Sequence, residues 1–471
     1  MSGNDLLSEE PELVAGISRG PLRLYAPPSR LPRPAPDGIG GPLLRAQTPE
    51  GRNLLSSFAA SRPLGLYVSG RPGTGKSTLF LHLVLEDIRL GRGCCLIDPH
   101  GDLVAAVLER CPADPEIVQR ILVFDPADTE HPIGLDCLGV KSERERELAV
   151  QFMLSLYETL FLPDHQGPML HQSLGNGMRL LMEQEGSLVE LPALFLDEKF
   201  LRGKLERCQN PWVRQFFQGV WLGSSRSSRA DSFAYFTSKL ARFLDDPMLR
   251  NILGQKGGPD LGAHLNRGGV VLARLSSGAI GKMNARLLGM MLLHKLEAIT
   301  RAREGMPPSA RPPLHIYVDE FHELVTEDVG EFLSCARKYG VGLHLAHQRM
   351  EMLGTRIREA ILGTLGHWIF FRQGGGSDLF HFTSLLWPRF CERDLLSVSN
   401  YETLVRVTGS EGTGRVGRVA IPAAGPILGT AAPIEAESRL RFGQPRKAVE
   451  VEILERMGWA RKAEDTLVQI T

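Results

Sequence analysis

A glycine-rich run that ends in a lysine and a hydroxyl residue is the clearest candidate for chemistry in this sequence. Gly70-Arg71-Pro72-Gly73-Thr74-Gly75-Lys76-Ser77 fits the pattern GxxxxGK[ST], and Thr78 follows it. Glycines let successive backbone N–H groups wrap around phosphate oxygens, and the N-terminus of a following helix adds to the attraction. In this pattern Lys76 reaches the β- and γ-phosphates and Ser77 binds Mg²⁺. Residues 70–78 are therefore predicted to form a P-loop (Walker A) site for ATP and Mg²⁺.

A second candidate group is a pair of acids at the end of an apolar segment. Residues 314–318 (LHIYV) lead directly into Asp319 and Glu320. In a P-loop ATPase, Asp319 would hold the Mg²⁺ shell and Glu320 would act as the general base on water, which is the Walker B arrangement. The alternative is a solvated helix start with two acids, but the upstream P-loop favours the catalytic interpretation. The acid pair also disfavours a GTPase, which usually positions water with a glutamine.

Three more polar residues lie at the ends of expected strands or helices. Gln348, just beyond an expected strand at 342–346, is a candidate sensor of the γ-phosphate. Arg337, at the end of the preceding helix, is a candidate arginine finger for a neighbouring subunit, or simply a cation that favours its helix's C-terminus. Asp98 follows the strand at 94–97 and could face the same crevice, whereas Asp102 could merely cap the next helix.

Two short segments carry basic and hydroxyl groups suited to a phosphate backbone. The expected loop 275–286 contains Lys282 and Arg286, and the segment 224–229 contains Arg226 and Arg229. Such groups bind nucleic acid without reading its bases. Neither segment has the aromatic residues on which single strands stack, which weakly favours duplex DNA. The alternative is that both are ordinary solvated loops.

The hydrophobic pattern predicts a sheet that would position these residues. Expected strands at 64–69, 94–97 and 121–124 alternate with helices at 77–90 and 102–110, a rhythm typical of a parallel sheet. Further strands are expected at 269–275, 314–318, 342–346 and 367–372, with intervening helices at 285–303, 329–339 and 355–362. The fold class is therefore α/β with a mainly parallel sheet.

The same pattern divides the chain into five segments. They are a proline-rich N-terminal tail (1–45), the first part of the core with the P-loop (46–140), an all-helical insertion (141–262), the second part of the core with Asp319 and Glu320 (263–430), and a C-terminal segment (431–471). Within the insertion we expect helices at 143–161, 168–184, 211–220 and 232–243. A hairpin is expected at 404–420, and residues 446–465 are expected to form either a helix or a strand followed by a helix.

Composition limits the possible partners and compartments. Lys plus Arg and Asp plus Glu both number 54, so the formal net charge is zero, and a polyanion would have to bind a local basic patch. No apolar run reaches the roughly 18 residues of a transmembrane helix, and the N-terminus lacks a signal-peptide core. The seven cysteines form no CxxC pair, which indicates free thiols. We therefore expect a cytoplasmic protein.

Several motifs together resemble a known group of motors. DPHGDL at 98–103, YVDEF at 317–321 and ARKYGVGLHLAHQ at 336–348 resemble the HerA/FtsK superfamily of hexameric P-loop ATPases. Within it, the sequence is most similar to the type IV secretion coupling proteins, the TraD/TraG-like conjugative DNA translocases. The resemblance extends over about residues 60–430 and includes 243–255 and 269–275. It departs from that group in three respects. Coupling proteins generally begin with transmembrane helices, the proline-rich tail matches no family role, and no winged-helix module like that of FtsK follows.

This resemblance implies a ring of six RecA-like subunits that hydrolyses ATP at its interfaces and moves DNA through a central channel. It assigns Arg337 as the finger that acts on the neighbouring subunit and Gln348 as the sensor. It also implies backbone contacts with little sequence specificity and recruitment to a membrane or secretion complex. The alternatives are a protein-secretion or assembly ATPase of a type IV-like machine and a nucleotide-gated scaffold. A metabolic kinase is disfavoured, because of the Asp-Glu strand end and the long helical insertion.

Overall fold

A single mixed sheet forms the centre of the molecule. The computed structural model describes residues 22–23, 58–59, 61–140, 142–160, 168–225, 245–325, 329–409 and 411–459. The strand order is β1-β10-β9-β8-β2-β7-β6-β3-β5-β4. Neighbouring strands from β8 to β4 are parallel, whereas β9 is antiparallel to both β8 and β10. The predicted α/β fold with a mainly parallel sheet is confirmed.

The parallel strands match the expected ones to within a few residues. They are β2 (Leu66–Ser69), β3 (Gly93–Asp98), β4 (Ile121–Phe124), β5 (Val270–Arg274), β6 (Leu314–Val318), β7 (Val341–His347) and β8 (His367–Phe370). Because helices cover both faces of the sheet, these strands read as nearly continuous apolar runs. The expected hairpin is β9 (Glu402–Thr408) with β10 (Gly414–Ala420). The short strand β1 (Leu22–Arg23) was not expected and pairs with β10.

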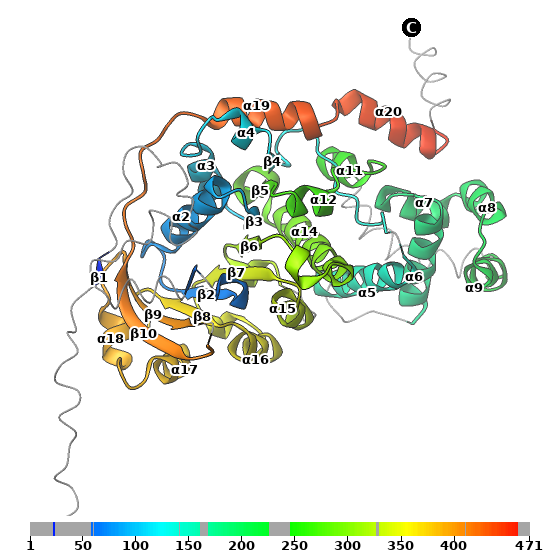
Figure 1. Cartoon of the computed structure of the whole chain (residues 1–471). Helices are drawn as coiled ribbons and strands as arrows, with labels where there is room; N and C mark the ends of the chain where they lie inside the picture. Colours follow the sequence, from blue (N-terminus) through cyan, green and yellow to red (C-terminus); the bar gives the residue numbers. More distant parts are fainter. Residues whose placement is uncertain are drawn as a thin grey trace, which may run out of the picture.

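Helices pack on the two faces of the sheet in separate hydrophobic clusters (Figure 1). One face carries α2 (Lys76–Arg89), α3 (Asp102–Leu108), α4 (Pro115–Val118) and α19 (Ala431–Phe442). The other carries α12 (Leu261–Asn266), α14 (Lys282–Ala302), α15 (Val329–Lys338), α16 (Thr355–Thr364), α17 (Asp378–Leu386) and α18 (Glu392–Ser397). Helices thus shield both faces of the sheet from water. Polar groups that follow the strands can therefore meet a ligand only at the strand ends.

Helices also make up the segment between β4 and β5, as expected. They are α5 (Glu143–Leu160), α6 (Pro168–Glu183), α7 (Leu191–Leu196), α8 (Glu198–Glu206), α9 (Pro211–Gln215) and α11 (Pro247–Leu253). The single helix expected at 211–220 is interrupted, because α9 gives way to a π-helical turn at Phe216–Trp221. The helix expected at 232–243 lies outside the described residues, as does the N-terminal tail apart from residues 22–23.

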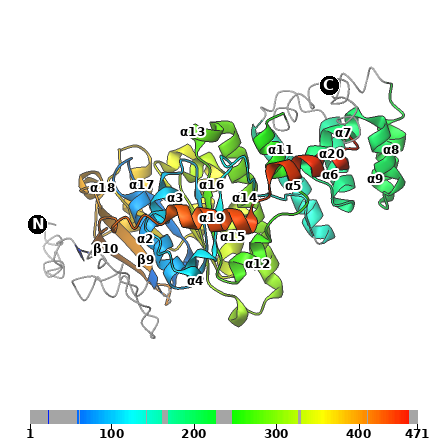
Figure 2. The same ribbon diagram turned by 90° about the horizontal axis from the view of Figure 1, so that it is seen from above.

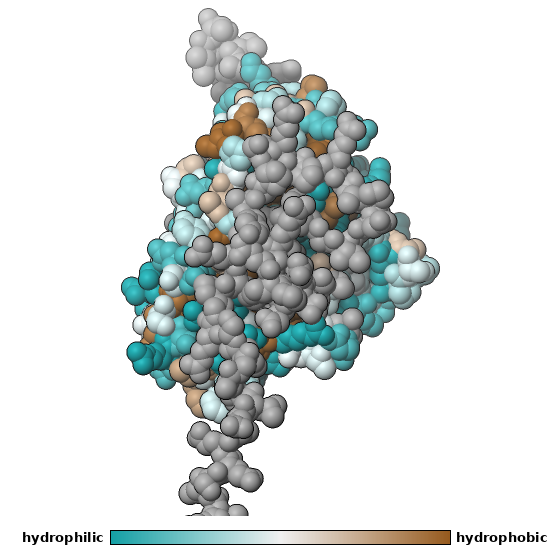
Figure 3. All heavy atoms as spheres, turned by 60° about the vertical axis from the view of Figure 1, so that its left-hand side comes forward, coloured by the Kyte–Doolittle hydropathy of each residue, from teal (hydrophilic) through white to brown (hydrophobic). Residues whose placement is uncertain are grey.

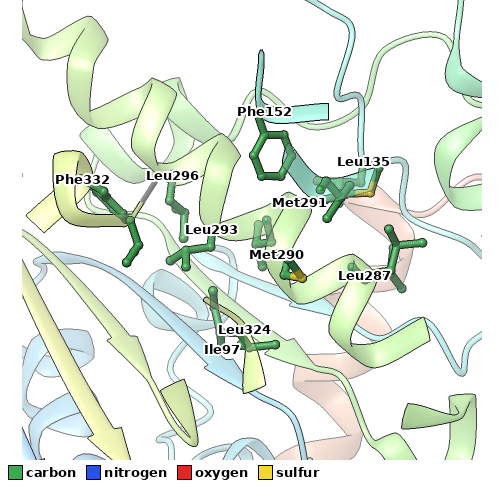
Figure 4. Packing of buried hydrophobic residues seen from close by; sticks show 14 of the residues in the cluster. Ile97, Leu135, Phe152, Leu287, Met290, Met291, Leu293, Leu296, Leu324 and Phe332 are labelled. Carbon is green, nitrogen blue, oxygen red and sulfur yellow. The ribbon is translucent and has the colours of Figure 1, made fainter. Parts of the chain in front are cut away.

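Helix α14 is the main packing element between the sheet and these helices (Figure 4). Its buried side chains approach β3, α15 and the helix α5, so one helix contacts several parts of the core. The labelled neighbours in the close view are Ile97, Leu135, Phe152, Leu324 and Phe332. The apolar residues of α14 recur with helical spacing, which gives the broad buried face that this position requires.

The C-terminal helices lie across both parts of the molecule (Figure 2). In α19, Ser438 Oγ accepts a hydrogen bond of 2.8 Å from Val123 N of β4. In α20 (Arg446–Arg456), Val449 and Ile453 are buried, and the helix packs against α11. The helix expected within 446–465 therefore ends at Arg456. Residues 431–456 connect the sheet with the helical segment.

The surface is mainly polar where Figure 3 shows described residues, with small separate apolar patches. Among the described helices, none combines the length and the hydrophobicity that crossing a membrane would require.

Candidate nucleotide-binding site

The strand order brings the predicted site residues to one edge of the sheet. Strand β2 ends at the P-loop, β6 ends at Asp319, and β7 lies between them and ends before Gln348. The register aligns Ser69 with His347 and Val318 with Leu345, so the carboxyl ends of the three strands are adjacent. Ligands of open parallel sheets bind at this edge.

The P-loop has the conformation that its glycines allow. Gly73 and Gly75 have positive φ angles of 73° and 120°, which side-chain-bearing residues rarely adopt. A Cβ atom at Gly75 would also lie 2.9 Å from Cε1 of Phe371. Lys76 Nζ donates to Gly70 O at 2.9 Å, and the helix α2 begins at Lys76. The loop therefore presents backbone N–H groups and a helix N-terminus to a phosphate.

Ser77 and Asp319 form a site that fits Mg²⁺. Ser77 Oγ donates to Asp319 Oδ2 at 3.3 Å, although 242 residues separate them. Burial, together with the neighbouring carboxylates of Glu320 and Asp98, raises the pKa of Asp319 to about 6. A divalent cation would offset this crowding of negative charge, and Mg²⁺ prefers oxygen ligands. Bound there, Mg²⁺ would neutralise charge on the phosphates.

Glu320 is buried and held in a defined position. Its φ of 43° is unusual for a non-glycine residue, and its N–H donates to Asp319 Oδ1 at 3.0 Å. Gln348 Nε2 donates to Glu320 Oε1 at 3.3 Å. His322 Nδ1 lies 3.5 Å from Glu320 Oε2 without hydrogen-bond geometry. Burial lowers the pKa of His322, so this neighbour is neutral at pH 7.

Lys76 is placed between the phosphate-binding loop and these acids. Its side chain is 6% exposed, and burial lowers its pKa, while Glu320 and Asp319 oppose that shift. The two carboxylates thus favour the charged form that binds phosphate oxygens. The structure brings Lys76, Ser77, Asp319, Glu320 and Gln348 together from three strand ends.

Asp98 ends β3 next to Asp319 at the end of β6, as expected for a residue of this crevice, and it also caps the helix that follows. Its Oδ2 accepts hydrogen bonds from Leu103 N at 2.8 Å and from Val104 N at 3.0 Å, so Asp98 caps α3. The predicted cap, Asp102, is exposed in the first turn of that helix. Asp98 influences the site through its charge, which contributes to the raised pKa of Asp319.

Arg337 lies far along α15 from the phosphate site of its own chain. It is exposed at the end of α15, just before β7 starts. Arg311, which precedes β6, donates from Nη1 to Lys338 O at 2.9 Å. Both observations place Arg337 at the amino end of the sheet, opposite the P-loop edge.

Among the residues that the structure describes, the candidate DNA contacts do not form one patch. Residues 275–286 are not a simple loop, because α13 (Ser277–Ile280) and the start of α14 occupy most of the segment. Gly281, which has a φ of 85°, separates the two helices. Lys282 is 78% exposed and lies 3.4 Å from Glu323 Oε1, whereas Arg286 is half-buried. Arg226 and Arg229 lie outside the described residues.

Residues after β8 complete the site and were missed by the sequence analysis. Gln373 Nε2 donates to Ser69 O at 3.1 Å, and its Oε1 accepts from Ser69 Oγ at 3.2 Å. Tyr401 N donates to Thr74 O at 2.9 Å. No local sequence motif marks a single glutamine or tyrosine in a turn as a site residue. Only contacts over some three hundred residues of chain identify them.

The sequence matches no model of a protein family and no curated protein. Among solved structures, it is similar to the unbound monoclinic form of the bacterial conjugative coupling protein TrwB (TM-score 0.55, 15% identity, covering 78% of this chain and 87% of that one). TrwB in complex with ADP and Mg²⁺ is similar at TM-score 0.54, with the same identity and coverage. VirB4 of Thermoanaerobacter pseudethanolicus matches less well (TM-score 0.49, 15% identity, 76% and 89% covered). The predicted resemblance to coupling proteins is thus confirmed at the level of the fold.

Proposed function

We propose that this chain is a Mg²⁺-dependent ATPase of the type IV secretion kind, and that it works as a DNA-translocating ring motor. The observation that carries the ATPase is the convergence of Ser77, Asp319, Glu320 and Gln348 within hydrogen-bonding distance at one sheet edge. The same fold in TrwB, which has been solved with ADP and Mg²⁺, supports these cofactors. It also supports the link with conjugation, through the name of that protein.

In the proposed hydrolysis each of these residues has one role. The N–H groups of the P-loop and Lys76 bind the phosphates, and Ser77 with Asp319 would hold Mg²⁺. Glu320 accepts a proton from water as the water oxygen attacks the γ-phosphorus and the bond to the β-phosphate oxygen breaks. Gln348, bonded to Glu320, senses whether the γ-phosphate is present.

A ring is the arrangement that gives Arg337 a role. Because Arg337 is exposed at the sheet edge opposite its own P-loop, it can act on a nucleotide only from a neighbouring subunit. An arginine finger supplied in this way stabilises charge in the transition state. The proposed assembly is a homo-hexamer with a nucleotide at each interface. In that assembly Lys282, Arg286, Arg226 and Arg229 remain the proposed DNA contacts.

The test is steady-state ATP hydrolysis with and without single- and double-stranded DNA, over a series of salt concentrations. Glu320→Gln should lower kcat by about 10²- to 10⁴-fold, because it removes the general base. ATP binding should persist in this variant. For turnover without DNA, Glu323→Gln is the matched control, since Glu323 lies in the next turn and faces Lys282 rather than the P-loop. Full turnover by Glu320→Gln would contradict the mechanism.

DNA stimulation that falls with rising salt would support the motor, because phosphate contacts weaken as salt increases. Turnover that is indifferent to every DNA would favour the second candidate, an ATPase that moves protein. One observation favours that candidate. A groove of about 1890 Å³ between α5, α12, α14 and α15 has a charged lining with more acids than bases, which suits a polypeptide better than DNA.

A further inference from the structure

Tyr401 is a large aromatic residue in an unusual position beside the P-loop. Its backbone has a φ of 63°, a conformation that is strained for a bulky side chain, and its side chain is 46% exposed. Among the described non-glycine residues, positive φ angles occur also at Glu185 and at the proposed base Glu320. Strained backbone of this kind is concentrated at ligand sites.

The surrounding structure fixes this conformation from both sides. Tyr401 N donates to Thr74 O at 2.9 Å, and Tyr401 O accepts from Ile421 N at 2.6 Å. The preceding Asn400 Oδ1 accepts from Arg372 Nη2 at 2.9 Å. The strained turn is therefore tied to the P-loop, to the residue after β10 and to the end of β8.

The ring itself lies against the P-loop. A Cβ atom at Gly75 would come 3.0 Å from Cδ1 and 3.5 Å from Cε1 of Tyr401. One edge of the ring thus packs on the backbone that surrounds the phosphates, while about half of the side chain stays open to solvent. Burying that remainder against a flat, apolar ligand would be favourable.

The strand order gives the direction in which a nucleotide must extend. Around the P-loop strand the order is β9-β8-β2-β7-β6, so Glu320 and Gln348 lie on one side of β2. Tyr401, immediately before β9, lies on the other side. A nucleotide whose γ-phosphate meets Glu320 therefore directs its ribose and base towards β8 and β9.

We infer that Tyr401 is the platform on which the base of the nucleoside triphosphate stacks. The inference rests on the proposed nucleotide site and adds a residue that contacts the substrate. Stacking depends on the face of a base and not on its hydrogen-bonding edge, so adenine and guanine both fit. The fixed, strained turn holds the ring in place before the nucleotide binds, which lowers the entropy lost on binding.

Calorimetric titration of the full chain with two ligands tests this role. The ligands are a non-hydrolysable ATP analogue and inorganic tripolyphosphate, each with Mg²⁺. Tyr401→Gly removes the ring and adopts the positive φ without strain, and Tyr401→Phe keeps the ring. Phe380→Ala is the control, because Phe380 is 78% exposed on α17 and is not among the groups that contact Gly75.

We expect Tyr401→Gly to raise the Kd of the ATP analogue by about 5- to 150-fold, the effect of losing one stacked base. The Kd of a guanine analogue should rise by the same factor in this variant. The affinity for tripolyphosphate should not change, and Tyr401→Phe and Phe380→Ala should bind both ligands like the unaltered chain. If Tyr401→Gly does not fold, Tyr401→Asn replaces it, since Asn also tolerates this backbone.

Equal losses for the ATP analogue and tripolyphosphate would overturn the inference, because Tyr401 would then only support the loop. Unchanged affinity for both ligands would overturn it as well. If the unaltered chain binds neither ligand, the proposed nucleotide site itself fails, which is a separate outcome.

Discussion

At the scale of single residues, buried polar groups are stabilised only where a partner is close. Asp98 is 1% exposed, and its carboxylate accepts three backbone N–H bonds, from His100, Leu103 and Val104. Asp319, next to it in the sheet edge, has fewer donors, and its pKa is raised. The contrast separates a carboxylate used for capping from one suited to a metal ion.

His367 is a buried residue whose protonation should destabilise the fold. It is fully buried, its Nε2 lies 2.8 Å from Ser61 O, and burial lowers its pKa to about 4. The unfolded chain, with a His pKa of about 6.5, binds this proton first as the pH falls. His367 should therefore reduce the free energy of unfolding by about 1.4 kcal/mol per pH unit below 6.5, or about 3 kcal/mol by pH 4.

Urea denaturation from pH 7 to pH 4 measures this effect. Other buried histidines add to the total slope, so the quantity of interest is the difference between the unaltered chain and His367→Gln. Glutamine can still donate to Ser61 O but does not titrate. Parallel pH profiles for the two proteins would contradict the assignment.

At the scale of elements, α14 is the helix on which the packing of the core depends. Leu296 is completely buried within its apolar face (Figure 4). Leu296→Ala should lower the free energy of unfolding by about 2–5 kcal/mol, because it removes buried methyl groups and leaves a cavity. Leu440→Ala, on α19 where the side chain is 80% exposed, should change it by less than about 0.5 kcal/mol. Denaturant midpoints of the two variants give the comparison, and equal shifts would refute it.

At the scale of the whole molecule, a variant of Arg337 tests whether the subunits work together in a ring or independently. Arg337→Ala should lower kcat by about 10³-fold or more, because the developing charge on the phosphates loses its partner. Lys338→Ala, at the adjacent exposed position, is the matched control and should keep its activity.

Mixing two inactive variants tests whether Arg337 acts between subunits. Lys76→Ala lacks a working P-loop and Arg337→Ala lacks the finger, so each alone should be inactive. In a mixed ring, an Arg337→Ala subunit next to a Lys76→Ala subunit has both parts, and turnover should return in part. No recovery over any mixing ratio would mean that Arg337 does not act in trans.

Local patterns in the sequence were sufficient to predict the elements and many of the residues placed at the sheet edge. The P-loop, the Asp319-Glu320 pair, Gln348 and the parallel strands all follow from local patterns, because glycine spacing and hydrophobic periodicity act over a few residues. The interruption at Phe216 and the helix in 275–286 were missed, since short helical stretches give weak periodic signals.

The arrangement of these elements in space became clear only from the three-dimensional structure. Strand β7 between β2 and β6 joins Gln348 to Glu320, and no local pattern encodes that order. The position of Arg337 relative to its own P-loop and the contact of Tyr401 with Thr74 have the same origin. Each depends on pairing between segments far apart in the chain, which is set by the burial of the whole core rather than by the sequence around any one residue.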